Sequence, residues 1–294
     1  MKKVLPHGKC RKISKIRFFT KGFWYTFPSE EFMGLAKFII DIAVKNQKIE
    51  SFQNYLFIGP HPDDIEIGAG ATVSKLKKLN KKVTFLICLD GRFGKENLKE
   101  DISSEELAKI RKEECLKSAS LLGVDECLFL DLCDGGQYTE RELLQGIARI
   151  INQVKPDIIF APDPDIISEC HVDHLRVGKA AKELANFANY KEIFQTYLPD
   201  GMQVNDGISI EALALYFTNK PNKYVRTYGH FKKQLEAIYC HASQYPKGAP
   251  QTKSIVTYLK VRGVDFGLRR FSIPAEGFRM MNKMRMHCLP EASK

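Results

Sequence analysis

One imidazole and two adjacent carboxylates follow a strongly apolar run of the sequence. His61, Asp63 and Asp64 come directly after residues 55–60, and a stretch rich in small residues follows them. This order predicts a buried strand, a tight polar turn and the start of a helix. Open α/β sheets place their ligand sites at the carboxyl ends of strands. Because burying such groups is costly unless they pair or hold a metal, the turn is a candidate metal site.

A second cluster of the same residue types lies further along the chain. His171, Asp173 and His174 follow an apolar run over residues 157–161 that predicts another strand. The carboxyl ends of neighbouring parallel strands meet at one edge of a sheet, so this cluster is expected to lie near the first. A catalytic zinc keeps three protein ligands and leaves one position for water. The two clusters together are therefore predicted to form one zinc site.

The predicted metal ligands are His61, Asp64 and His174. They offer two nitrogens and one carboxylate, a set of the kind that hydrolytic zinc enzymes use. The same set also suits Fe²⁺ or another divalent metal. Each motif has a structural alternative, because an aspartate pair after proline often caps a helix and a histidine pair can begin a helix at the surface. Their joint placement after two strands at one sheet edge favours the metal site.

The remaining polar residues of the two clusters are predicted to be catalytic. Asp63 lies next to a ligand and can take the proton from a metal-activated water as a general base. His171, if protonated, can stabilise a developing oxyanion. Asp173 can orient that imidazole and stabilise its protonated form. We therefore expect hydrolytic chemistry at this site.

Both motifs resemble those of the PIG-L/LmbE family of zinc-dependent de-N-acetylases. The resemblance covers about residues 53 to 280 and rests first on residues 61–68 and 171–174. Val172 stands where the second motif of the family often has proline, and valine also adopts an extended backbone. Supporting stretches are Asp90-Gly91-Arg92, Arg111 with Glu114, residues 155–162, residues 241–244 and residues 275–279.

The resemblance implies a Rossmann-like α/β fold, with a mostly parallel sheet and helices on both faces. It implies hydrolysis of an N-acetyl group from an N-acetylglucosamine-type amino sugar or its conjugate, with zinc as cofactor. It also implies that Arg92 lies near the substrate, where a cation can bind sugar hydroxyls or a phosphate. Two alternatives stay open: a non-catalytic carbohydrate-binding or scaffold protein on the same fold, and an amidase for another N-acylated glycoconjugate.

Hydrophobic patterning predicts the elements that must position these residues. Strands followed by helices along the chain indicate a doubly wound, mostly parallel sheet. We expect a basic and aromatic extension over residues 1–50 and a single α/β domain over residues 51–294. After Gly248 the pattern weakens. The predicted strands are 55–58, 82–89, 126–130, 157–161, 193–198 and 212–217, and the predicted helices are 30–50, 69–79, 104–122, 139–154, 174–188 and 228–240.

The net charge of +10 is concentrated at the ends of the chain. Residues 1–21 contain basic residues and no acid, and aromatic residues follow in 18–25. Such ends are either solvated or attracted to an anionic partner, and the interleaved aromatics favour an anionic membrane surface, through residues 1–28, or packing onto the body. No nucleic-acid-binding motif accompanies them, so no nucleic-acid partner is expected.

The cysteines and the apolar runs predict a cytoplasmic protein. None of the eight cysteines forms a C-x-x-C pair, and scattered cysteines without an export signal are typical of reduced thiols. The apolar stretches near the N-terminus are broken by charged residues, which argues against a signal peptide. No apolar run reaches the roughly 18 residues of a membrane span.

Overall fold

The computed structural model describes residues 15–20, 23–28, 39–40, 42–96, 98, 101–271 and 273–287. The chain divides into two compact units, one of Met1–Lys45 with Cys288–Lys294 and one of Asn46–His287. In the first unit, β1 (Lys15–Thr20) and β2 (Phe23–Pro28) pair as antiparallel strands. The first part of the helix predicted over 30–50, residues 30–38, lies outside the described residues, and its end is wrong because residues 45–48 have no regular structure.

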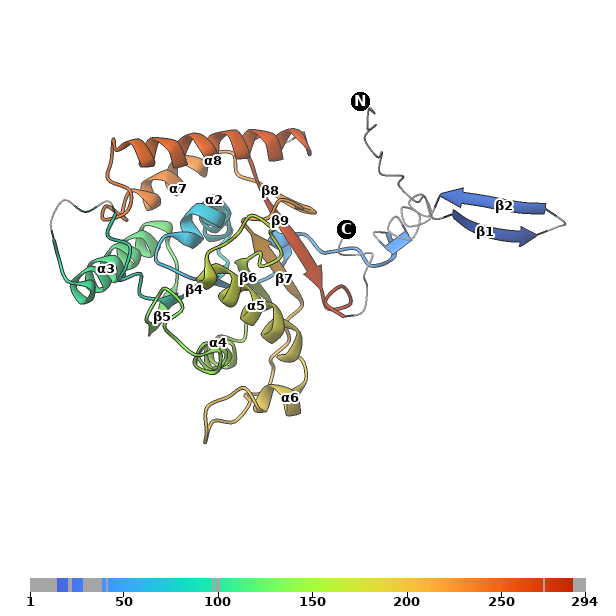
Figure 1. Ribbon diagram of the computed structural model, residues 1–294, viewed down its shortest axis with the longest axis horizontal. Helices are drawn as coiled ribbons and strands as arrows, with labels where there is room; N and C mark the ends of the chain where they lie inside the picture. The colour runs from blue at the N-terminus through green and yellow to red at the C-terminus, as the bar shows by residue number, and fades with distance from the viewer. Residues whose placement is uncertain are drawn as a thin grey trace, which may run out of the picture. The chain divides into compact units, whose positions relative to one another are not determined.

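The second unit is built on a seven-stranded sheet of order β5-β4-β3-β6-β7-β9-β8 (Figure 1). The strands from β5 to β7 in this order run parallel, and β9 runs antiparallel to β7 and β8. This mostly parallel sheet confirms the predicted fold class. The strands are β3 (Asn54–Gly59), β4 (Lys82–Leu89), β5 (Glu126–Leu132), β6 (Ile158–Pro162), β7 (Ala212–Tyr216), β8 (Lys223–Arg226) and β9 (Ala275–Asn282).

Helices cover both faces of this sheet. Alternate residues of one strand enter different cores: Leu56 and Ile58 pack with α4 and α5, whereas Tyr55 and Phe57 pack with α2, α3 and α7. This explains why the strands have continuous apolar runs instead of alternating ones. After η1 (Ile49–Ser51), the helices are α2 (Asp64–Lys78), α3 (Ser104–Leu122), α4 (Glu140–Val154), α5 (Val172–Phe187), α6 (Lys191–Gln195), α7 (Phe231–Ile238) and α8 (Pro250–Leu268).

Within the described ranges, no helix is both long enough and apolar enough to cross a membrane.

Local capping signals set several helix ends where the sequence predicts them. The Ser103 hydroxyl accepts the N–H of Glu106 at the start of α3, and Gly123 ends that helix with a φ of 81°. At the start of α4, Thr139 and Glu142 form the predicted capping box. These ends are confirmed because the cap residues determine them locally.

One prediction fails in the C-terminal half, and one region there has elements for which there is no prediction. The strand predicted over 193–198 is wrong, because residues 191–195 form α6 with Phe194 buried against the core. The region after Gly248 contains α8 and β9, which patterning does not predict. On α8, buried Leu259 and Phe266 lie opposite exposed Val261 and Leu268, so apolar residues on both sides hide the helical period.

Gly68 allows α2 to approach β7 closely. A Cβ at this position would lie 2.3 Å from Cδ2 of Tyr216, whose hydroxyl donates to the carbonyl of Ile58 at 2.8 Å. The ring therefore has little freedom to move away. The glycine fixes the distance between the helix that begins at the first motif and the sheet.

We predict that Gly68→Ala lowers the free energy of unfolding by about 1–3 kcal/mol, because the new methyl group overpacks this contact. Urea denaturation measures the change. The control is Gly263→Ala in α8, where a Cβ meets only Pro274 at 3.4 Å and the carbonyl of Ala275 at 3.8 Å. Helix propensity should make that variant about 0.5–1 kcal/mol more stable. Equal stability of the two variants would contradict the close approach.

Candidate active site

The first motif forms a tight turn between β3 and α2. The backbone N–H of His61 donates to Oδ2 of Asp64 at 2.9 Å, so the Asp64 carboxylate folds back over the turn. Asp63, between them, has a φ of 115°, which is rare for a residue with a side chain. Such strained backbone is often found at functional sites, where surrounding structure holds it in place. The turn thus separates the two adjacent carboxylates.

The three predicted metal ligands lie together. Oδ2 of Asp64 is 3.3 Å from Nδ1 of His61 and 3.4 Å from Nε2 of His174. Their possible ligand atoms all lie within 4.8 Å of one another. In tetrahedral zinc sites with bonds of 2.0–2.2 Å, ligand atoms are about 3.3–3.6 Å apart. The geometry and the donor types therefore fit a divalent metal such as zinc.

Each of the two histidines also contacts a carboxylate through its other ring nitrogen. Nε2 of His61 is 3.1 Å from Oδ2 of Asp173, and Nδ1 of His174 is 3.0 Å from Oε2 of Glu169. Metal-binding histidines usually have such a partner, which fixes the ring and its tautomer. Glu169 is absent from the sequence prediction, because a glutamate five residues before a histidine forms no recognisable motif.

Asp173 is held by several donors at once. Its carboxylate accepts the N–H groups of Gly135 and Gly136 at 2.7 and 2.9 Å and the hydroxyl of Tyr138 at 3.1 Å. Burial alone would raise the pKa of Asp173, but the hydrogen bonds from His61 and these N–H groups outweigh it and lower the pKa to about 2. Asp173 is therefore a charged and fixed partner for the ring of His61.

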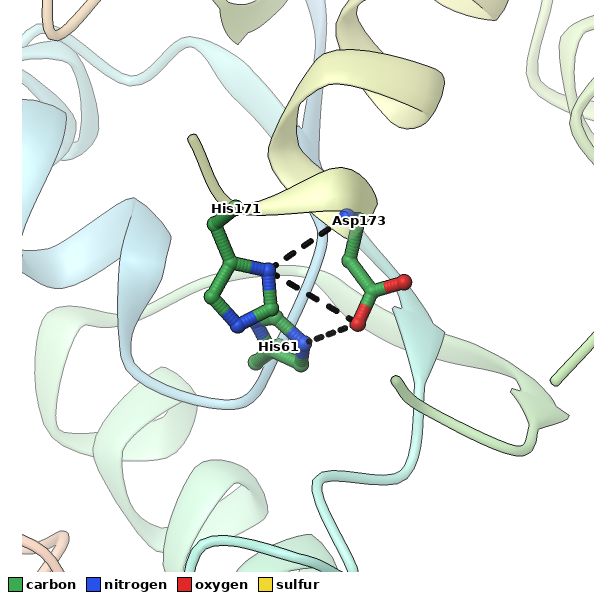
Figure 2. A group of neighbouring side chains, drawn as sticks. All are labelled: His61, His171 and Asp173. Atoms are coloured by element: carbon green, nitrogen blue, oxygen red, sulfur yellow. Dashed lines mark hydrogen bonds and ion pairs between the residues drawn. The ribbon is translucent and has the colours of Figure 1, made fainter. Parts of the chain in front are cut away.

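The side chain of His171 is half exposed. Figure 2 shows its ring beside His61 and Asp173. Its Nδ1 is 3.8 Å from Oδ2 of Asp173, so the closer carboxylate contact goes to His61 and not, as the sequence suggests, to His171. Nδ1 instead accepts the backbone N–H of Asp173 at 3.4 Å. Partial burial and the neighbouring His61 and His174 lower the pKa of His171. The neutral ring, with its proton on Nε2, is thus favoured.

The candidate ligands depend on one another for their charge states. Burial lowers the pKa of His61 and of His174, but nearby carboxylates outweigh it and raise these pKa values to about 9 and about 10. The same contacts hold the pKa of Asp64 well below its usual range despite its burial. In the metal-free protein both rings are therefore protonated at neutral pH.

Arg111 from α3 holds Asp63. Its Nη2 is 3.1 Å from Oδ2 of Asp63 and donates to the carbonyl of Pro62 at 2.8 Å, and Nη1 donates to the carbonyl of Gly91 at 3.0 Å. Burial raises the pKa of Asp63 to about 6, although Arg111 opposes the rise. The carboxylate is therefore mostly ionised at pH 7 and reaches its midpoint near pH 6.

Arg92 lies on the loop after β4, as predicted. In the part of the chain that the structure describes, its side chain contacts Asp90, at 2.6 and 2.7 Å, and Glu105, at 3.4 Å. The candidate ligands are not among these contacts. Nearby, Oδ2 of Asp134 accepts the N–H of Phe93, while its buried Oδ1 has no partner among the described residues. The loop after β4 thus offers a cation beside a buried carboxylate of the loop after β5.

Comparison with known proteins identifies the family. The model of the PIG-L family, GlcNAc-PI de-N-acetylase, matches residues 56–185, which include both histidine motifs. The chain is 32% identical over 247 residues to the diacetylchitobiose deacetylase of Thermococcus kodakarensis, covering 84% of this chain and 90% of that protein. It is similar to the structure of N,N'-diacetylchitobiose deacetylase from Pyrococcus horikoshii complexed with its inhibitor MPG, with 32% identity, a TM-score of 0.75, and coverage of 89% and 95%.

The fold alone occurs in a protein of another class. GalB, the 4-carboxy-2-hydroxymuconate hydratase from Pseudomonas putida, matches with a TM-score of 0.63 at 17% identity, covering 78% of this chain and 96% of that one. Fold similarity at this identity says nothing about the reaction. The family match and the 32% identity to a deacetylase do establish the family of this chain. The chain belongs to the PIG-L family of deacetylases, as the motifs predict.

We predict that zinc affinity rises with pH. A metal must displace the protons of His61 and His174, whose pKa values are raised to about 9 and about 10. The apparent affinity should increase by about ten- to a hundredfold per pH unit between about pH 6 and pH 8, as one or two protons are released. Competition with a chromophoric chelator measures it. An affinity independent of pH would show that these rings are not ligands.

We predict that Glu169→Ala weakens zinc binding by about 10- to 100-fold, because the ring of His174 loses its orienting carboxylate. Glu169→Gln keeps an oxygen acceptor and should weaken it less. The control is Glu192→Ala, at an exposed position of α6. Equal zinc affinities in the Glu169→Ala and Glu192→Ala variants would rule out the positioning role.

Proposed function

We propose that this protein is a metal-dependent hydrolase that removes the acetyl group from an N-acetylglucosamine-type amino sugar or its conjugate. The observation that carries the proposal is the convergence of His61, Asp64 and His174, with the second ring nitrogen of each histidine on a carboxylate. Membership of the PIG-L family supplies the reaction class. The relatives named as diacetylchitobiose deacetylases suggest the substrate type.

In this proposal, His61, Asp64 and His174 hold a divalent metal. Zinc fits the ligand set best, and Fe²⁺ is the alternative. The metal supplies Lewis acidity, which lowers the pKa of a water molecule and polarises the amide carbonyl. Asp173 and Glu169 orient the two imidazoles, so that the other nitrogen of each ring would bind the metal once that ring has lost a proton.

Asp63 acts as the general base. Its pKa of about 6 leaves it mostly ionised at pH 7, yet basic enough to take a proton from the attacking water. It then delivers that proton to the amine that leaves. Arg111 holds the carboxylate in place at 3.1 Å throughout. Because the base must be ionised, the rate should fall as the pH drops through about 6.

His171 stabilises the oxyanion by donating a hydrogen bond. The contact of its Nδ1 with the N–H of Asp173 supports a neutral ring that carries its proton on Nε2. This form replaces the protonated imidazole that the sequence suggests. Removing one hydrogen-bond donor to a developing oxyanion typically lowers kcat by about 10²- to 10³-fold.

The sugar is proposed to lie toward the loop after β4. Arg92 can donate to its hydroxyls even while paired with Asp90. We keep the alternatives of a non-catalytic carbohydrate-binding protein and of an amidase for another N-acylated glycoconjugate as outcomes of the test below.

The division into units at Lys45 and Asn46 supports a separate N-terminal extension over residues 1–50. Residues 1–28 are proposed to contact an anionic membrane surface, and no nucleic-acid partner is proposed. The described cysteines are free thiols, which supports a cytoplasmic location.

Acetate release tests the proposed function. The zinc-loaded protein should release acetate from N-acetylglucosamine or N,N'-diacetylchitobiose. Binding of these sugars without release of acetate would favour the non-catalytic alternative. Activity only on other N-acyl glycoconjugates would favour the amidase.

We predict that Asp63→Asn retains zinc but loses about 10²–10⁴ in kcat, because it can no longer accept a proton. The control is Asp131→Asn, an exposed carboxylate that pairs with Lys112. Metal analysis accompanies the kinetics so that a lost metal is not mistaken for a lost base. Near wild-type turnover in the zinc-loaded Asp63→Asn variant would remove Asp63 from the mechanism.

A further inference from the structure

A half-exposed aromatic ring lies on the loop between β4 and α3. Phe93 directly follows Arg92 on this loop and is 50% exposed. A single exposed apolar side chain is common and needs no explanation by itself. Phe93 differs because contacts from two sides hold it in place, and because residues of the candidate active site take part in both.

Side chains from other elements fix the backbone at Phe93. Its N–H donates to Oδ2 of Asp134, on the loop after β5, at 3.3 Å. One residue further on, the carbonyl of Gly94 accepts the side-chain amide of Gln244, which follows α7, at 2.7 Å. A side chain on a fixed backbone loses little conformational freedom when a ligand binds, so Phe93 is preorganised as a contact.

Arg111 attaches the same loop to the proposed general base. Its Nη1 donates to the carbonyl of Gly91 at 3.0 Å, and its Nη2 is 3.1 Å from Oδ2 of Asp63. Gly94 leaves room for this guanidinium, because a Cβ there would lie 2.8 Å from Nη1. The arginine that holds Asp63 therefore also helps to set the position of Phe93.

On its other side, the ring of Phe93 packs against the turn after β5. A Cβ on Gly135 would lie 3.4 Å from Cδ2 of the ring, so the ring is next to the backbone of this glycine. The N–H of Gly135 donates to Oδ2 of Asp173 at 2.7 Å, and the same oxygen is 3.1 Å from Nε2 of His61. One glycine therefore separates the ring from the carboxylate that contacts a candidate metal ligand.

The surface beside Phe93 leads to His171. A Cβ on Gly136, the next residue of the turn, would lie 3.4 Å from Cγ1 of Val172, which is 37% exposed and directly follows His171. Gly135 and Gly136 have φ values of 68° and 75°, and they have no side chain that could rise between Phe93 and Val172. A ligand whose amide lies at the metal site and His171 can therefore extend along these glycines to the ring.

The residues at the end of this path suit a sugar. A pyranose ring has hydroxyls at its edge and C–H groups on its faces, and the negative face of an aromatic ring attracts such C–H groups. Arg92, next to Phe93, has a partly exposed side chain that can donate to the hydroxyls while it pairs with Asp90. A hydrocarbon would use only the aromatic ring and an anion only the guanidinium, so a sugar fits the pair better than either.

We propose that Phe93 stacks its exposed ring on the apolar face of a sugar ring of the substrate, which makes it a specificity-determining residue. The inference rests on the proposed deacetylation and names the contact that recognises the sugar. The metal site acts on an amide, which every N-acetylated compound contains, whereas stacking requires a ring. Because Phe93 lies away from the reacting atoms, it contributes to binding and not to the chemical step.

The test measures KM and kcat of the zinc-loaded protein for N,N'-diacetylchitobiose. Phe93→Leu keeps an apolar side chain against Gly135 but removes the aromatic face, and it should raise KM by about two- to tenfold with kcat unchanged. Phe93→Tyr keeps the ring and should keep KM within about twofold of wild type. The matched control is Phe271→Leu, at an exposed phenylalanine after α8, which should leave KM unchanged.

The outcomes separate this inference from the proposed function. Equal KM values in the wild-type and Phe93→Leu proteins would overturn the stacking role, and so would an equal rise of KM in Phe93→Tyr. Zinc affinity is measured in the same variants, because a loss in Phe93→Leu would show an effect through Gly135 and Asp173 and would also overturn the role.

If no amide is hydrolysed, the proposed function fails, and calorimetry with N,N'-diacetylchitobiose decides the role of Phe93. Binding about two- to tenfold weaker in Phe93→Leu than in the wild-type and Phe93→Tyr proteins supports it. Equal binding in all three proteins, or no binding to the wild type, overturns it.

Discussion

The cost of burying charge at the end of β3 determines how this site is built. His61, Asp64 and Asp173 are all buried, and none of them would be stable there alone. Each carboxylate therefore lies against an imidazole. The carboxylate of Asp173 also accepts the backbone N–H groups of Gly135 and Gly136. In the metal-free state these pairings satisfy the cluster with protons. A metal would replace the protons without moving the groups, which is the property expected of a preorganised site.

The sequence predicts the parts of the structure that local chemistry determines. The strand over 82–89 and the helix over 104–122 are found with their predicted bounds, because continuous burial and a serine cap with a glycine stop act within a few residues. The meeting of the two histidine motifs is also predictable, since it follows from their places at the ends of parallel strands. Whether these residues perform the assigned roles remains a prediction that depends on the metal.

Other features depend on contacts between distant segments and leave no local signal. Glu169 becomes important only because the loop before α5 returns it to His174. The pattern of α8 is weak because apolar residues such as Val261 and Leu268 also lie on its exposed side. Phe217 looks like the continuation of a strand, yet its positive φ turns it toward the site. Since the same fold also occurs in a hydratase, the chemistry must be argued from the residues at this sheet edge rather than from the architecture.

The central claim is that a metal held by His61, Asp64 and His174 makes this protein a deacetylase. The most direct test removes all metal with a chelator and then titrates zinc back while acetate release from N,N'-diacetylchitobiose is measured. Activity should be absent at first and should rise in proportion to bound zinc, up to about one equivalent per chain. The His174→Ala variant should neither bind that equivalent nor recover activity. Full activity of the metal-stripped protein, or an equal recovery in the variant, would contradict the account.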